Sequence, residues 1–364
     1  MRKIAYTLHW SPIWGRGILK KVLSQARSWL EAGHDVRLFM LTPAADAAEH
    51  IREVDSLVPV SIRLYHGLAG RFAHYYPLVR MVLDWQPDLL YHRYAGYYPA
   101  LAGLAGSLPT VFEINTDDVN EYRIGPAYRY WYNRLTRRRL LSRARGMIFL
   151  TAEISRRPHF TCFHKPSTVI SNGIALSRYS PLPPASNPHP RLIFIGSPGE
   201  PWHGIDKIFL LAERFPAWCF DVVGPHAAQI EHPTPANLTL HGPLDRSQYE
   251  PLFAQADVAI GTLALHRNKM QEASPLKVRE YLAFGLPTII AYNDTDFPDQ
   301  HPFILQIANT PDNVLVEVER IAQFVEAVRG RRIPRSDIEH LDVAYKERQR
   351  LEFFHRVLAQ GQQS

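Results

Sequence analysis

Glu272 and Glu280 lie eight positions apart in a stretch whose other residues predict how they are held. Ser274 is a favourable N-cap, and Pro275 suits the first helical position, where a missing N–H group costs nothing. A helix is therefore predicted to begin between the two glutamates, with Lys277 in its first turn. The helix dipole disfavours a cation at that end, whereas the free N–H groups attract an anion. The pattern favours an anion-binding site with two carboxylates beside it.

The first half of the chain alternates short apolar runs with amphipathic stretches. Buried strands are predicted over residues 3–10, 35–41, 88–94, 110–115 and 146–151. Helices are predicted between them over residues 18–32, 72–85 and 127–142. Such alternation predicts a doubly wound α/β domain, with a parallel sheet and helices on both faces.

A proline-rich segment then interrupts the pattern. Residues 181–190 contain five prolines, so they can continue neither a helix nor a central strand and are predicted to be a linker. Alternation resumes with strands expected over 191–195, 220–223, 237–241, 257–261 and 287–292, and with helices over 204–213, 247–256 and 275–284. We therefore expect two domains, 1–180 and 191–336, followed by a long helix within 337–364. Ligands are expected beyond the carboxyl ends of the strands.

The stretch from Glu272 to Pro287 resembles the E-x7-E motif of retaining GT-B glycosyltransferases. Its Ser-Pro start and Gly-x-Pro end are similar to glycosyltransferase family 4. Residues 91–94 and 112–115 resemble first-domain strands of a subgroup that assembles surface polysaccharides. The resemblance covers nearly the whole chain and implies two Rossmann-like domains facing across a cleft. It implies an acceptor site in residues 1–180, a donor site in residues 191–336 and a last helix that returns to the first domain. It further implies transfer from a UDP- or GDP-linked sugar to a glycan, a lipid-linked glycan or another acceptor, without a metal ion or other cofactor.

The resemblance also assigns roles to individual residues. Glu280 would bind the ribose of the donor, and Glu272 would contact the transferring sugar, with Asn115 as a second catalytic candidate. Arg93 and Glu113 would bind the acceptor. The remaining donor-binding candidates are Ser274, Pro275, Leu276, Lys277, Gly196, Ser197, His203, Lys207, Gly224 and Gly17.

Three positions depart from the family pattern. Asn115 stands where many members have a histidine that touches the donor sugar, and asparagine cannot take up a proton at neutral pH. Ser197 and His203 stand where many members have arginine and lysine for the diphosphate. We expect Lys277, Lys207 and the helix start at Ser274 to replace part of that charge, and His203 to help if protonated.

Two other motifs carry less weight. Asp294 and Asp296 form a D-x-D sequence, as in metal-dependent GT-A enzymes, but lie in a turn-rich segment where aspartates commonly cap the backbone. Asp117 and Asp118 are interpreted in the same way, as residues at a helix start. Lys20 occupies the third glycine position of a G-x-G-x-x-G motif, which argues against a dinucleotide fingerprint.

Composition and charge limit the cellular compartment and the classes of partner that the sequence allows. The two cysteines are too few for a disulfide framework and suggest a reducing cytoplasm. Residues 1–180 carry a net charge of +11 and residues 181–364 one of −5. Arginines alternate with aromatic residues over 128–145, which suits a scaffold helix first, an anionic membrane surface second and nucleic acid a distant third. Alternative functions are a GT-B nucleotide-sugar epimerase and a non-catalytic nucleotide-sugar-binding descendant.

Overall fold

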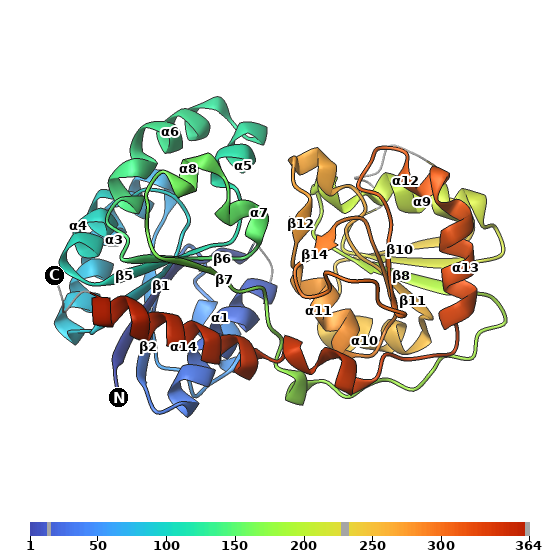
Figure 1. Ribbon diagram of the computed structural model, residues 1–364, viewed down its shortest axis with the longest axis horizontal. Coiled ribbons are helices and arrows are strands. Elements are labelled where there is room, and N and C mark those ends of the chain that lie inside the picture. Colours follow the sequence, from blue (N-terminus) through green and yellow to red (C-terminus); the bar gives the residue numbers. More distant parts are fainter. Residues whose placement is uncertain (13–15, 227–232, 361–364) are drawn as a thin grey trace. The chain divides into compact units, whose positions relative to one another are not determined.

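The computed structural model describes residues 1–12, 16–226 and 233–360 of the 364-residue chain (Figure 1). The chain forms two compact units. Unit 1 combines Met1–Gly173 with Val343–Ser364, and unit 2 is Ile174–Asp342. Each unit has its own parallel sheet, so the predicted fold class is confirmed.

Unit 1 has the strand order β3-β2-β1-β4-β5-β6-β7. Its strands are β1 (Lys3–His9), β2 (Asp35–Thr42), β3 (Val60–Leu64), β4 (Leu89–Arg93), β5 (Thr110–Ile114), β6 (Gly146–Phe149) and β7 (Ser167–Val169). Its helices include α1 (Arg16–Glu31), α2 (Ala47–Val54), α3 (Gly67–Trp85), α4 (Pro99–Ser107), α5 (Asp118–Ile124), α6 (Ala127–Leu141), α7 (Ala152–Ser155) and α8 (Pro158–Thr161). Every residue of β1 after Lys3 is buried, as expected for a strand covered on both faces.

The last helix, α14 (Val343–Gln360, red in Figure 1), packs on the core of unit 1. Phe354 lies 5.4 Å from the Trp29 ring of α1 and 5.2 Å from the Tyr91 ring of β4, measured between ring centroids. Phe353 approaches the start of β6 so closely that a Cβ atom on Gly146 would lie 2.8 Å from its ring. This close approach explains why a glycine occupies that position.

Unit 2 has the strand order β10-β9-β8-β11-β13-β15 and a separate short pair, β12-β14. The strands are β8 (Arg191–Ile195), β9 (Cys219–Val223), β10 (Leu238–Gly242), β11 (Val258–Ile260), β12 (Glu272–Ala273), β13 (Thr288–Ile290), β14 (Asn293–Asp294) and β15 (Ile304–Gln306). The helices include α9 (Ile205–Arg214), α10 (Arg246–Gln255), α11 (Leu276–Ala283), α12 (Asn313–Val316) and α13 (Val318–Val328). The order reverses between β8 and β11, so the loops after these strands lie at the switch point of the sheet, where α/β folds bind ligands.

The boundary segments differ from the expectation. Residues 174–180 group with unit 2, since the Ile174 N–H donates to the Leu341 carbonyl at 2.9 Å. The proline-rich segment also lies on unit 2, where the Leu182 N–H donates to the Phe284 carbonyl at 3.0 Å. The expected single helix from residue 337 is a 3₁₀ helix (Arg335–Leu341) followed by α14, because Asp342 between them adopts an extended conformation.

No helix in the described part of the chain has both the length and the apolar character needed to cross a membrane.

Candidate functional site

Glu280 projects from α11 of unit 2 and is held through one of its two oxygens. The Tyr249 hydroxyl donates to Oε1 at 3.0 Å, and the Tyr179 hydroxyl donates to the same atom at 3.4 Å. Burial, followed by the nearby charge of Glu280, raises the pKa of both tyrosines, so both hydroxyls stay protonated and act as donors. The sequence indicated neither tyrosine, since they lie 101 and 31 positions from Glu280.

The start of α11 differs in detail from the prediction. The N-cap residue is Pro275, not Ser274, and Leu276 opens the helix. The Ser274 hydroxyl instead accepts a hydrogen bond from Arg279 Nη2 at 2.8 Å. The N-cap expectation for Ser274 is therefore wrong, because the turn before the helix is built around the buried arginine.

Arg279 also explains the D-x-D sequence. Its guanidinium is fully buried and lies 2.6 Å from a carboxylate oxygen of Asp294 and 2.6 Å from one of Asp296. Burial opposes the charged form of Arg279, but both carboxylates favour it, and its pKa is raised. The two aspartates therefore neutralise a buried cation, which gives them a structural role within unit 2.

Lys277 lies in the first turn of α11, as expected. Its Nζ lies 4.1 Å from the centroid of the Phe194 ring and has no hydrogen-bond partner among the described residues. Burial lowers the pKa of Lys277 well below its ordinary value, and Glu200 offsets this only in part. An anionic ligand next to this buried group would strongly stabilise its charged form.

The loop after β8 is packed tightly through two glycines. Gly224 has a φ of +114°, and a Cβ atom there would lie 1.7 Å from the Gly196 carbonyl oxygen. A Cβ atom on Gly196 would lie 2.5 Å from the Phe194 ring and 2.7 Å from His203 Nδ1. Ser197, the next residue, is exposed. The glycines thus bring the backbone of this loop close to the imidazole of His203.

His203 cannot supply a positive charge to this loop. Burial, and then the neighbouring charge of Lys277, lower its pKa to about 2, so the imidazole stays neutral. Its Nδ1 atom is buried and has no hydrogen-bond partner in the residues that the structure describes. His203 can therefore offer a neutral hydrogen bond, and a contribution from it as a cation is not supported.

Lys207 has a structural role instead of the expected one. Its Nζ donates to the Thr310 carbonyl and to Asn313 Oδ1, both at 2.6 Å, and the side chain is buried. The lysine thereby joins α9 to the start of α12. The prediction that its charge binds the donor is not supported, because two of its three N–H donors already bind oxygen atoms within unit 2.

Glu272 forms the two-residue strand β12 with Ala273, and it pairs in parallel with Asn293 of β14. Its side chain is half-buried. The structure therefore places Glu272 just before α11 and Glu280 in the second turn of that helix. The role of Glu272 toward a sugar stays a prediction.

In unit 1, Asn115 follows the carboxyl end of β5. Lys21 Nζ donates to Asn115 Oδ1 at 2.8 Å, and Asn115 Nδ2 is buried without a hydrogen-bond partner in the described residues. Because a lysine can only donate, this contact directs the amide nitrogen elsewhere, so Asn115 can donate to a ligand. Gly17 lies exposed near the start of α1, and Gly15, the first glycine of the same G-x-G sequence, lies outside the described residues.

Glu113 is buried inside unit 1, where its carboxylate is surrounded by cationic side chains. It is 3% exposed, and its carboxylate lies 3.0 Å from Lys21 Nζ, 3.6 Å from Arg93 Nη1 and 3.8 Å from Arg350 Nη2 of α14. Burial alone would raise the pKa of Glu113, but these three cations hold it below its ordinary value. An acceptor cannot reach this carboxylate without opening the network, so its expected acceptor-binding role is not supported. Arg93 is partly exposed and keeps that role as a prediction.

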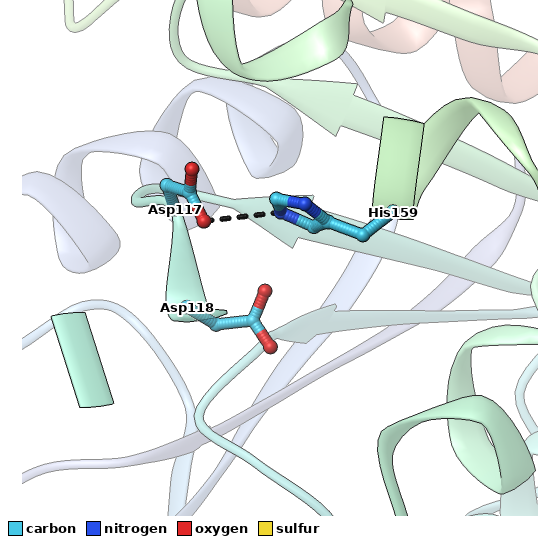
Figure 2. Close-up of side chains that lie close together, drawn as sticks. All are labelled: Asp117, Asp118 and His159. Carbon is cyan, nitrogen blue, oxygen red and sulfur yellow. Dashed lines mark ion pairs between the residues drawn. The ribbon is translucent and has the colours of Figure 1, made fainter. Parts of the chain in front are cut away.

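Figure 2 shows three potential metal ligands that come together in the described part of unit 1, Asp117, Asp118 and His159. His159 Nε2 lies 3.0 Å from Asp117 Oδ1, and Arg137 Nε lies 2.9 Å from Asp118 Oδ2. Asp117 also accepts a hydrogen bond from a backbone N–H group in the first turn of α5, as expected for a helix cap. These contacts account for both carboxylates, and we assign no metal site here.

Comparison with known proteins finds the family resemblance in the first half of the chain. Residues 16–178 match the family model described as Glycosyltransferase Family 4. A search of the curated proteins with the sequence gives no match.

Solved structures share the fold along almost the whole chain. HepE of Anabaena, solved with UDP and glucose, is 16% identical with a TM-score of 0.65 and covers 98% of this chain and 100% of its own. Sucrose-phosphate synthase of Thermosynechococcus elongatus is 14% identical, with a TM-score of 0.64 and coverage of 100% and 98%. A protein described as a UDP-N-acetylglucosamine 2-epimerase from Listeria monocytogenes is 11% identical, with a TM-score of 0.56 and coverage of 96% and 94%. The predicted GT-B fold is thereby confirmed.

Proposed function

We propose that the protein is a retaining glycosyltransferase that moves a sugar from a nucleotide-sugar donor to a glycan, a lipid-linked glycan or another acceptor. One observation carries the proposal. A single helix of unit 2, α11, holds the half-buried carboxylate of Glu280 one turn from the buried amino group of Lys277, which has no hydrogen-bond partner among the described residues. A carboxylate suits ribose hydroxyls and an ammonium suits a diphosphate, so the two groups match the two parts of a nucleoside diphosphate.

The residues of this site also indicate how transfer would proceed. Lys277 would stabilise the negative charge that develops on the leaving diphosphate. The departing phosphate oxygen would take the proton of the acceptor hydroxyl, so no protein base is needed on that face. This route does not require Asn115 to act as a base, a role that its amide cannot fill.

Metal-independent transfer is part of the proposal. The D-x-D carboxylates lie against Arg279, so a divalent cation would have to displace a buried guanidinium. Lys277 supplies the positive charge that a metal ion supplies to the diphosphate in other transferases. We propose that no organic cofactor takes part.

An epimerase is the second candidate, because the structural relatives include a protein described as one. The two functions differ in their products. A transferase releases the nucleotide and extends an acceptor, whereas an epimerase returns an altered nucleotide sugar without any acceptor.

A ligand screen followed by product analysis tests the proposal. UDP, GDP and their glucose, galactose, mannose and N-acetylglucosamine conjugates would be tested for a rise in melting temperature, since a ligand that binds only the folded state stabilises it. The conjugate with the largest effect would then be incubated with and without lipid-linked acceptors. Release of nucleotide that requires an acceptor supports transfer. Absence of any nucleotide binding, or an acceptor-independent change in the sugar, would contradict it.

We further propose that unit 1 lies in the cytoplasm and docks reversibly on anionic lipid. Helix α6 exposes a stripe of apolar side chains, with Trp131 59% and Leu135 73% exposed. Tyr132 of this helix contacts Phe72 of α3, with ring centroids 5.9 Å apart, and Leu68 and Tyr76 are exposed on the same face of α3. The Phe72–Tyr132 contact joins the two helices, and we call their exposed apolar side chains together the α3–α6 surface.

The charges around the α3–α6 surface favour anionic lipid over a neutral partner. Helix α6 has no acidic residue, and its exposed arginines include Arg134, Arg138 and Arg139. Each basic residue near an anionic leaflet contributes about 1 kcal/mol, and salt weakens the effect. Apolar side chains flanked by arginines are typical of helices that lie in the membrane interface.

Vesicle sedimentation tests the docking surface. The double variant Trp131→Ser, Leu135→Ser should bind phosphatidylglycerol-containing vesicles less than the unchanged protein, whereas Leu315→Ser, Val316→Ser should not. The control pair is also apolar and exposed, but it lies in unit 2. Equal binding by both variants, or no binding of the unchanged protein at low salt, would contradict the proposal.

A further inference from the structure

The two tyrosines that contact Glu280 are fixed by their own packing. The Tyr179 ring contacts both Arg246, whose Cζ is 4.4 Å from its centroid, and Phe284, whose ring is 5.1 Å away, and Arg246 also lies over the Phe284 ring. The Tyr249 ring packs against Phe253 at 5.2 Å. Their hydroxyls therefore reach the carboxylate from rigid positions in two different segments of unit 2.

Both hydroxyls donate to the same oxygen. A carboxylate has about four acceptor positions, two on each oxygen. The two tyrosines occupy Oε1, and no hydrogen bond to Oε2 occurs within the described residues. The arrangement fixes the rotation of the carboxylate and leaves Oε2 with its full capacity to accept.

We propose that Tyr179 and Tyr249 are positioning residues, which hold Oε1 of Glu280 so that Oε2 accepts both vicinal hydroxyls of the donor ribose. The inference rests on the proposed function. It explains why two protonated phenols converge on one oxygen, where a single bond would suffice to satisfy it. It also makes the site selective for ribonucleotides, because a deoxyribose leaves a prepared acceptor unused.

The competing explanation is that the tyrosines only join α10 and the segment at Tyr179 to α11. Such a bracing role would weaken every nucleotide equally when a hydroxyl is removed. A positioning role would weaken only nucleotides that carry ribose hydroxyls. Comparing variants across two ligands therefore separates the explanations, as in a double-mutant cycle.

The experiment measures calorimetric affinities of UDP and GDP, each beside its 2′,3′-dideoxy form. The proteins are the unchanged chain, Tyr179→Phe, Tyr249→Phe, Glu280→Ala and the control Tyr292→Phe. Tyr292 is also a buried tyrosine of unit 2, but its hydroxyl has no hydrogen-bond partner in the described residues. Melting temperatures of all variants would be recorded, since each Tyr→Phe change removes one oxygen atom only.

We expect Tyr249→Phe and Tyr179→Phe to weaken the ribonucleotide about three- to tenfold and to leave the dideoxy form within about twofold. Tyr292→Phe should change neither. Equal losses for both nucleotides, or no loss for either, while Glu280→Ala weakens only the ribonucleotide, would overturn the positioning inference and leave the proposed function standing. Unchanged ribonucleotide binding in Glu280→Ala would instead overturn the donor site itself, and the inference with it.

Discussion

Glu272 and Glu280 lie in neighbouring elements, yet they should contribute to different steps. Glu280 would contact the ribose in both the ground state and the transition state. Glu272, before α11, would meet a sugar whose anomeric carbon becomes cationic during transfer, so its charge should matter more in the transition state. We expect Glu272→Gln to lower turnover on the order of a hundredfold and leave nucleotide affinity unchanged.

Steady-state kinetics with the donor and calorimetry with the nucleotide measure the two effects of Glu272→Gln separately. The exposed Glu213→Gln in α9 is the matched control, and it should alter neither quantity. Full turnover in Glu272→Gln would show that the residue is structural.

Lys277 should make nucleotide affinity depend on pH. Its pKa in the free protein is lowered by burial, whereas a bound diphosphate would favour the charged form and raise it again. Between these two pKa values, binding takes up a proton. Affinity should therefore fall as pH rises through this window, by up to about tenfold per pH unit.

A pH series with a UDP-sugar measures this linkage, since a diphosphate diester has no phosphate group that titrates near neutral pH. Lys277→Arg keeps its charge at every pH and should flatten the profile. Lys277→Met should bind weakly throughout. The same pH slope in Lys277→Met as in the unchanged protein would assign the proton to another group.

At the scale of elements, the last helix, α14, supplies buried apolar residues to the core of unit 1. Phe354 is 1% exposed and packs on Trp29 and Tyr91. We expect Phe354→Ala to lower the free energy of unfolding by about 3–5 kcal/mol, as for other buried phenylalanines cut to alanine. Urea unfolding followed by tryptophan fluorescence measures the change, because Trp29 is in contact with the site. Glu352 is exposed on the same helix, so Glu352→Ala should leave the free energy of unfolding nearly unchanged. A similar loss of stability in this variant would show that helix propensity, and not packing, determines the effect.

The elements themselves could be predicted where a strand is long and buried. Strands β1, β2, β4, β5, β8 and β9 lie within one or two residues of the predicted ranges. Strand β3 was missed because Val60–Leu64 lies at the edge of the sheet and is only partly buried, which weakens its apolar pattern. Strands β7 and β15 have three residues each, too few to show a period.

The roles of site residues could be predicted where their neighbours are close in the sequence. They could not be predicted where the role depends on residues far away in the sequence. The placement of Glu272, Lys277 and Glu280 around one helix start follows from neighbouring residues. The structural role of Lys207 depends on Asn313, 106 positions away, and that of Glu113 depends on Arg350 in α14. Tyr179 looks like an ordinary packing residue beside a proline-rich segment, so nothing in its spacing pointed to Glu280.

At the scale of the whole molecule, the proposed reaction takes the positive charge for the diphosphate from the chain itself. We expect transfer activity to persist in excess EDTA, because Asp294 and Asp296 are already bound to Arg279. Initial rates with and without the chelator measure this. The control is Asp299→Asn, which removes a nearby carboxylate that has no role in the proposed site. Complete loss of activity in EDTA, restored by Mg²⁺ or Mn²⁺, would contradict a metal-independent reaction.

The return of α14 to unit 1 has a consequence for how the protein is made. The ribosome releases unit 2 as one continuous stretch, whose first and last residues meet where Ile174 pairs with Asp342. Unit 1 must wait for its last helix while those residues are translated, on the order of ten to thirty seconds at ordinary rates. During that interval the surface around Trp29 and Tyr91 stays uncovered, so the nascent chain offers chaperones an aromatic surface that the finished protein no longer exposes.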